Sequence, residues 1–346
     1  MPACCSFGTC GSNSAWRQDG WPVPDTRLQE VTLIRIVAKK LLQAVPVILI
    51  ISILAFLLLS LLPGDPALII AGEQASPAAV EQVRRQLGLD RSFFEQLAVW
   101  LFNLAQGNFG SSLILNQSVL SAVLERLPVT LSLAGLSISI TIPVGVLLGS
   151  VAAYFRRTWI DSLVMTVALF GVSIPAFWIA ILGVILFSVQ LGWVPSSGFV
   201  PISQGVGPWF SSIILPALIL SLFQIGFLAR MTRSAMLDVL SQDYIRTARA
   251  KGLSEWRTIG KHGLRNALIM IITATGILLS AAIGGSVIIE QVFALPGIGR
   301  MVVQAILARD YPLVQGTMLI LGFTFVMINL TVDILYTLAD PRVSHD

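Results

Sequence analysis

Few side chains in this sequence could carry out catalytic or metal chemistry. The cysteines, Cys4, Cys5 and Cys10, all lie in the first ten residues, and the only histidines are His262 and His345. Two histidines so far apart cannot build a metal site by themselves, because zinc and nickel sites need several clustered ligands. No Gly-x-Ser-x-Gly motif marks a serine nucleophile. The sequence therefore predicts no catalytic residues and no metal ligands.

The sequence also lacks a loop that could cradle the phosphates of ATP. Such a loop reads Gly-x-x-x-x-Gly-Lys-Ser/Thr, so that backbone N–H groups surround the phosphates. The only Gly-Lys pair is Gly260-Lys261, which is followed by His262, and Glu255 stands where the first glycine is required. We therefore expect no ATP hydrolysis by this chain and no cofactor bound to it.

Composition indicates the environment in which the remaining residues must fold. The chain has 346 residues, of which 55% are hydrophobic and only 12% are charged. Soluble domains carry about 25% charged residues, and disordered chains are more polar still. The net charge of +4 is too small to indicate a nucleic-acid partner. These values favour a protein whose apolar surface is covered by membrane lipid.

Stretches without Asp, Glu, Lys or Arg identify the membrane spans, because one such residue at mid-bilayer costs about 2.5 to 3.5 kcal/mol. Residues 162–229 are uncharged, and these 68 residues exceed the roughly 20 that one crossing needs. They must fold back at the polar, turn-forming segment 192–212. We predict an all-α membrane protein with six transmembrane helices. The predicted spans are 41–62, 127–155, 163–190, 212–230, 266–289 and 311–332.

Two other interpretations of the apolar runs fit less well. A cleaved signal peptide has an apolar run of about 7 to 15 residues followed by a small-residue cleavage site. The run at 41–62 has 22 residues and no such site follows it. A membrane β-barrel would alternate apolar and polar residues along each strand, which these runs do not.

The placement of basic residues predicts the orientation in the membrane. Sixteen of the 22 Lys and Arg residues fall on one predicted side, eight of them in the loop 230–265. Of the other six, four lie in a loop of 66 residues, a length at which charge no longer governs orientation. Both termini and the loop 230–265 are therefore predicted to be cytoplasmic.

Five parts of the chain differ in character. We expect a disordered N-terminal extension, a cytoplasmic entry with the first span, an external loop, a permease core of five spans and a cytoplasmic tail. These parts are 1–30, 31–62, 63–125, 126–338 and 339–346. In the external loop, Ser76 is expected to cap a helix beginning at Pro77, and 93–106 is expected to form a second helix. This loop could pack over the bundle or dock an external partner.

The loop 230–265 is too long for a turn and too short for a core of its own, so it must pack on the bundle or on another protein. Leu237, Leu240, Tyr244 and Ala248 follow steps of three and four and predict one apolar helical stripe. Small residues around Gly252 would let a partner approach closely, and Gly252 can end the helix. A cytoplasmic protein is favoured as the partner over the membrane surface.

Several residues within the predicted spans could serve packing or transport. Gly145 and Gly149 form a small-xxx-small pair, for which close helix packing is favoured over lining a path. The amides Gln224 and Asn329 could face a water-filled translocation path or bond to a neighbouring helix, and both uses stay open. Prolines within the spans, including Pro175, are interpreted mainly as ordinary kinks.

At the loop 230–265 the sequence resembles a known family. DYIRTARAKGLS at 243–254, followed by GLRNAL at 263–268, resembles the coupling loop of ATP-binding-cassette importer permeases, in the dipeptide, oligopeptide and nickel branch. Similar segments extend the resemblance over about residues 31–346. These segments are LGLDRSFFEQLAVWLFNLAQGNFGSSL, RLPVTLSLA, EQVFALPGIGR, RDYPLVQG, and the ending DILY with DPR.

The match to the loop of the wider superfamily is partial. That loop reads Glu-Ala-Ala, three residues, Gly, and nine residues later Ile-x-Leu-Pro. Ala248, Gly252 and Leu264 agree with this pattern, while Arg246 and Thr247 replace its first two residues. The isoleucine and proline positions hold His262 and Arg265. These departures are typical of the peptide branch. Arg246 stands where the superfamily has glutamate, and a positive side chain cannot pair with the same group as a negative one, so the role of Arg246 stays open.

The resemblance implies a fold, a mechanism and partners. The fold would be that of a type I importer permease, and a short helix from Tyr244 to Gly252 would sit in a cleft of a cytoplasmic ATPase subunit. Closure of the ATPases would then drive alternating access. The implied coupling residues are Asp243, Tyr244, Arg246, Thr247, Ala248, Gly252 and Leu264.

The implied assembly comprises a second homologous permease, two ATPase subunits that bind ATP and Mg, and an external substrate-binding protein. It would carry short peptides across the bacterial cytoplasmic membrane. Uptake of nickel or a nickel chelate is the alternative within the family. A passive channel or a membrane scaffold with a docking loop is the alternative from another class.

Overall fold

The computed structural model describes residues 42–57 except 44, 66–71, 75–112 except 87 and 89, and 114–339. The predicted disorder of 1–30 and the tail 340–346 lie outside these residues. The chain divides into two units, 1–45 and 46–346. The smaller unit is described only at Leu42, Gln43 and Val45, which are helical. The larger unit contains every element named below, except that the helix Val45–Leu57 begins at the last residue of the smaller unit.

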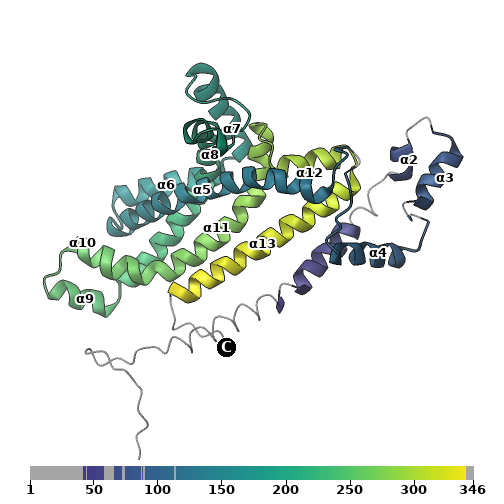
Figure 1. Ribbon diagram of the computed structural model, residues 1–346. Helices are drawn as coiled ribbons and strands as arrows, with labels where there is room; N and C mark the ends of the chain where they lie inside the picture. Colours follow the sequence, from purple (N-terminus) through teal and green to yellow (C-terminus); the bar gives the residue numbers. More distant parts are fainter. Residues whose placement is uncertain are drawn as a thin grey trace, which may run out of the picture. The chain divides into compact units, whose positions relative to one another are not determined.

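Within its described residues the larger unit is helical and has no strand beyond one isolated bridge, Ser111 to Ser118. The elements in chain order (Figure 1) are α2 Pro66–Ala71, α3 Pro77–Gln86, α4 Phe93–Ala105, α5 Val119–Tyr154, α6 Trp159–Ser173, α7 Ala176–Gly183, the π-helical η1 Val184–Gln190, the 3-10 turn η2 Ile202–Gln204, α8 Val206–Leu240, α9 Asp243–Ala250, α10 Glu255–Arg257, the π-helical η3 Thr258–Leu264, α11 Arg265–Val292, α12 Ile298–Leu307 and α13 Tyr311–Ala339.

The all-α membrane class is confirmed, with an approximate number of spans. In the described part of the chain, four helical segments are long and apolar enough to cross a membrane: α5, α8, the continuous α10–η3–α11 segment, and α13. The pair formed by α6 and α7–η1 makes a fifth span if its two halves are counted together. The first predicted span, 41–62, is described only in part, as the shorter apolar helix Val45–Leu57.

The predicted span 163–190 is not one helix. It is broken between Ser173 and Ala176, and its halves meet at 95°. Ile174 has ψ 132°, in the extended region, because the ring of Pro175 excludes the α conformation of the residue before it. Pro175 also supplies no N–H to continue α6, so at this position proline ends a helix and does more than kink it.

α5 and α8 are longer than the predicted spans because they continue beyond the apolar stretches into polar sequence. α8 runs on through Arg230 and Arg233 to Leu240, for 35 residues in all. At 1.5 Å per residue such a helix is about 52 Å long, against a hydrocarbon core of about 30 Å. Its final turns therefore reach the loop 230–265 without a break.

Close packing joins α5, α6 and α8, and the yellow α13 runs beside the green α11 (Figure 1). A Cβ added at Gly149 would lie 2.5 Å from the carbonyl oxygen of Ala229, and one at Gly145 would lie 2.9 Å from Leu228. On α8 itself, a Cβ at Gly226 would lie 2.3 Å from the carbonyl oxygen of Ala168 in α6. The predicted packing role of the Gly145 and Gly149 pair is confirmed.

The predicted helix signals of the external loop are also confirmed. Ser76 accepts a hydrogen bond from the backbone N–H of Ala79 at the start of α3. Ser92 caps α4 and exchanges side-chain-to-backbone bonds with Glu95, forming a complete capping box. α4 contacts the helix Val45–Leu57 through Phe56, whose ring centroid lies 5.4 Å from that of Phe93. Whether this loop also docks an external partner stays open.

We expect Gly149→Ala to lower the melting temperature of the purified protein, because the new Cβ would overlap the α8 backbone. Overpacking of this kind costs about 1 to 3 kcal/mol. Gly135→Ala is the matched control: it lies on the same helix, and a Cβ there meets nothing within 4 Å. The control should leave the melting temperature unchanged or raise it slightly, since alanine favours helix. Equal losses in both variants would contradict the packing role.

Candidate functional site

The candidate coupling loop contains a short, separate helix. α8 ends at Leu240 and α9 begins at Asp243, so the predicted stripe from Leu237 to Ala248 does not lie on one helix. The buried residue of α9 is Ile245, with no exposed surface, whereas Tyr244 is 44% exposed. The break at 241–242 changes which side of α9 is buried. The prediction from the spacing that Tyr244 belongs to the apolar stripe is therefore wrong, and Ile245 is the buried residue.

Gly252 ends α9 in the way the sequence predicts. Its φ is +78°, a left-handed conformation that glycine adopts without strain. The N–H of Gly252 donates to the carbonyl of Arg249 at 2.9 Å, and that of Leu253 donates to the carbonyl of Ala248 at 3.3 Å, which is a Schellman pattern. A Cβ at Gly252 would meet nothing within 4 Å. The backbone angle, and not lack of space, requires glycine here.

The loop returns to the bundle along η3 and α11. Arg249 and Glu255 join the two limbs by a bidentate ion pair of 2.9 and 3.1 Å, with both side chains nearly half exposed. Beyond it, Gly263 packs so closely on α8 that an added Cβ would lie 3.1 Å from Met236. Leu264 joins the same apolar cluster. These contacts hold α9 in a fixed place relative to the ends of α8 and α11.

The remaining coupling-loop residues face outward. Asp243, Arg246 and Thr247 are exposed, and Ala248 is partly buried. Arg246 makes only a 3.4 Å contact with Asp243, in which both side chains are largely exposed, so this pair contributes little to stability. Trp256, which the sequence analysis did not single out, is 83% exposed on α10. The outer face of the loop thus offers polar and aromatic groups that no described residue covers.

The two translocation-path candidates lie at contacts between helices. Gln224 on α8 is 2% exposed and accepts a 2.9 Å hydrogen bond from the hydroxyl of Thr141 on α5. Asn329 on α13 accepts a 3.2 Å bond from the hydroxyl of Ser280 on α11. Each amide therefore bonds to a neighbouring helix, and a role in the path stays a prediction. The Nε2 of Gln224 has no partner among the described residues.

A buried carboxylate that sequence reasoning missed joins three helices. Glu290, one residue beyond the predicted fifth span, has no exposed surface. Its Oε1 accepts from the hydroxyls of Thr130 (2.7 Å) and Ser286 (3.2 Å), and its Oε2 accepts from the backbone N–H of Arg300 (2.9 Å). Thr130 in turn accepts from the N–H of Ile298. The acid thus satisfies the free N–H groups at the start of α12 and ties them to α5 and α11.

The sequence did contain a signal for this cluster. Glu290 opens the motif EQVFALPGIGR, in which glycines follow the acid at a short interval. A Cβ at Gly297 would lie 2.3 Å from the carboxyl carbon of Glu290. Only glycine lets the backbone approach the carboxylate so closely. An acid at the end of an apolar run, followed by Pro-Gly-x-Gly, could therefore have been interpreted as a link between two helices.

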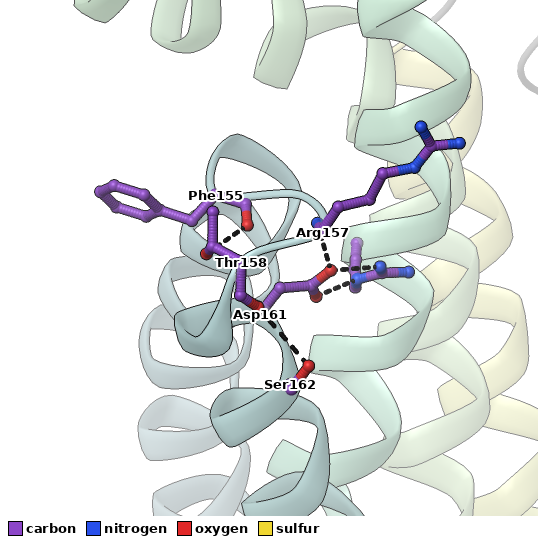
Figure 2. Close-up of polar contacts among 6 residues, drawn as sticks. Phe155, Arg157, Thr158, Asp161 and Ser162 are labelled. Carbon is purple, nitrogen blue, oxygen red and sulfur yellow. Dashed lines mark hydrogen bonds and ion pairs between the residues drawn. The ribbon is translucent and has the colours of Figure 1, made fainter.

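A second missed link joins α6 to α8 by an ion pair. The guanidinium of Arg233 donates to both carboxylate oxygens of Asp161, from Nε at 2.6 Å and from Nη2 at 2.7 Å. The carboxylate also accepts from the backbone N–H of Arg157, which has φ +64° in the turn before α6. Figure 2 shows the Arg157 side chain pointing away from this carboxylate. From the sequence, Arg233 was counted only as one of the eight basic residues in the loop 230–265.

A third buried acid connects the entry to α5 with the start of α13. Asp310 has no exposed surface and accepts from the hydroxyl of Ser112 at 2.5 Å and from the backbone N–H of Ile114 at 3.2 Å. Its other oxygen accepts from the N–H of Leu313 in the first turn of α13. In the described part of the chain, no group of three His, Cys, Asp or Glu residues is placed to hold a metal.

The sequence matches two parts of one protein family. Residues 145–345 match the family described as the binding-protein-dependent transport system inner membrane component. Residues 33–134 match the N-terminal part of the same kind of membrane component. The chain belongs to this family. The resemblance found at the coupling loop is therefore confirmed, and the permease has the many membrane-spanning helices expected of an inner-membrane component.

Relatives of this permease cover nearly its whole length. A putative peptide transport system permease protein of Brucella abortus is 60% identical over 311 residues, which is 90% of this chain and 99% of the relative. The glutathione transport system permease protein GsiC of Escherichia coli is 41% identical over 313 residues, 90% of this chain and 100% of the relative.

A solved structure shares the fold of the permease. The inward-facing MetNI methionine ABC transporter matches with a TM-score of 0.55 at 19% identity, over 64% of this chain and 97% of that one. At this identity the likeness concerns the fold alone. It agrees with the expected importer-permease arrangement of the helices.

We expect Glu290→Gln to destabilise the permease by roughly 2 to 4 kcal/mol. The amide nitrogen would face donors that now bond to a carboxylate oxygen, leaving buried groups unsatisfied. Thermal unfolding of the purified protein measures the loss. Glu125→Gln, an exposed change on α5, serves as the matched control and should have little effect. An unchanged melting temperature for Glu290→Gln would show that the carboxylate does not hold α12.

For the ion pair we expect Asp161→Asn to cost about 2 kcal/mol, because Arg233 is then left partly buried without its bidentate partner. In a double-mutant cycle, Arg233→Gln should add little to Asp161→Asn, with a coupling energy of at least about 1 kcal/mol. Asp238→Asn, an exposed acid on α8, should be neutral. Strict additivity of the two changes would contradict a direct link between α6 and α8.

Proposed function

We propose that this chain is one of two membrane-spanning subunits of an ATP-driven importer that carries short peptides into the bacterial cytoplasm. The observation that carries the proposal is the separate helix α9. Its Ile245 is fully buried, it packs beside η3 and ends at Gly252, and its other face is not covered by any described residue. Family membership supports the importer role.

We further propose the partners and the orientation. The loop 230–265 and both termini lie in the cytoplasm, where α9 docks on one of two ATPase subunits that bind ATP and Mg. A second, homologous permease completes the membrane part, and an external binding protein delivers the substrate. The concentration of basic residues on the side of this loop supports the orientation. The chain itself acts as a transport subunit and hydrolyses no ATP.

The mechanism follows from how firmly α9 is held. α9 packs beside η3, and the Arg249–Glu255 pair joins it to α10. η3 continues into α11, and its Gly263 closely approaches Met236 of α8. α8 then continues without a break through the bundle, and Asp161 links it to α6. A displacement of α9 by a closing ATPase would move these helices together, as alternating access between inward-open and outward-open states requires.

Peptides are the favoured substrate class because of the relatives. One relative, 60% identical, is named for peptide transport, and another, 41% identical, is named for the tripeptide glutathione. Nickel remains the alternative within the family, and a passive channel or scaffold the alternative outside it. An uptake assay separates them: cells that lack the gene and regain it should regain uptake of a labelled dipeptide or tripeptide. Gain of ⁶³Ni uptake instead, or peptide flux without ATP, would overturn the proposal.

Gly252→Val tests the coupling role. The variant should reduce peptide uptake and ATPase co-purification at least several-fold, because a β-branched residue at φ +78° is strained and would rebuild the end of α9. Gly260→Val is the matched control. It lies in the same loop without a positive φ, and a Cβ there meets nothing within 4 Å. If Gly252→Val retains normal uptake while the protein is present in the membrane, α9 is not the coupling element.

A further inference from the structure

A cavity of about 600 Å³ lies between the α5–α6 turn and the coupling loop. Its lining residues are Ala153, Tyr154, Phe155, Arg156, Thr158, Leu237, Leu240, Ser241, Arg249 and Glu255. One part of the wall is apolar and belongs to the ends of α5 and α8. The other part carries hydroxyl and charged groups. A cavity with this division suits an amphipathic ligand whose polar end is charged.

The charge in the cavity that is free to bind a ligand is that of Arg156. Arg249 is neutralised by its bidentate pair with Glu255. Arg156 is exposed, and its guanidinium has no hydrogen bond or ion pair with any described residue. Asp161, which lies within electrostatic reach of it, already bonds to Arg233 through both oxygens. An unpaired guanidinium beside a cavity recognises an anion, and phosphate matches its fork of donors.

The depth of the cavity favours a lipid as the source of that phosphate. It lies beside the C-terminal end of α5, where the uncharged run 127–155 meets Arg156 and Arg157, and such a change marks the level at which phospholipid headgroups meet the hydrocarbon. Tyr154, Phe155 and Trp159 surround this level, and Trp159 is 72% exposed. Aromatic side chains concentrate at this interface because their rings are apolar and their polar atoms reach water. Leu237 and Leu240 supply the surface along which an acyl chain would lie.

We propose that this cavity binds an anionic phospholipid, with Arg156 holding the headgroup phosphate and the ends of α5 and α8 contacting the acyl chains. A lipid bound here would touch both the α5–α6 turn and the loop that carries α9. The lipid would thus stabilise the position of the coupling loop from the membrane side. The inference depends on the chain spanning a membrane and is independent of the transported substrate, so its failure and that of the proposed function are distinguishable.

Native mass spectrometry of the purified full-length chain tests the site. Phosphatidylglycerol and phosphatidylcholine with identical acyl chains are added in equal amounts, and the bound lipid is counted. We expect about fivefold more retained phosphatidylglycerol, as one basic residue at the membrane surface supplies. Arg156→Gln should abolish this preference and Arg156→Lys should retain it. Arg265→Gln, which removes an exposed charge elsewhere on the same predicted side, should leave it unchanged.

Two further measurements keep the proposal falsifiable if Arg156→Gln fails to fold. On the wild-type protein, a photoreactive phosphatidylglycerol should crosslink within 153–158 or 237–255 more than elsewhere. Glycerol 3-phosphate at millimolar concentration should not displace the lipid, because it lacks acyl chains. Unlocalised crosslinks, displacement by glycerol 3-phosphate, or equal loss of preference in the Arg156 and Arg265 variants would overturn the site. So would an Arg156→Gln variant that retains its lipid and instead loses an ATPase subunit.

Discussion

The structure depends on one constraint, which is that a bilayer offers no water to polar groups within it. Among the described residues, the buried acids lie at helix ends, where free N–H groups or a guanidinium satisfy them. Asp161, Glu290 and Asp310 each follow this rule, and each joins elements that are distant in the sequence. Such acids are costly to bury unpaired, so they specify which helix ends meet.

The same constraint bears on the proposed role of the loop 230–265 as a lever. Helices packed by van der Waals contact alone could slide, but Asp161 fixes α6 to α8, and glycines on α5 and α8 bring the backbones together. α8 passes from this block directly into the loop that carries α9. Only residues 241–242 separate α9 from α8, so force applied at α9 would cross this short break and then pass along α8 into the bundle. The lipid site proposed at Arg156 lies at the junction of these parts.

Much of the fold could be predicted because the signals are local. Uncharged runs marked the spans, Ser76 lay at the start of a helix, and Gly252 ended α9 with a positive φ. Predictions failed where the packing of distant segments decided the local conformation. The stripe through Tyr244 assumed a continuous helix, and the break after Leu240 buried Ile245 instead. Pro175 was interpreted as an ordinary kink within one span, but α6 ends before it and the next helix turns away by 95°.

By itself the sequence determined the membrane class, the lack of a nucleotide-binding loop and the glycine that ends α9, because hydropathy, motif spacing and glycine angles act within a few neighbouring residues. Only the tertiary structure decided what each buried polar residue does. Gln224 bonds to Thr141 across 83 positions, Asp161 to Arg233 across 72, and Thr130 to Glu290 across 160. The energy of such a pair depends on two distant groups being buried together, a property of the packed helices that no stretch of sequence contains.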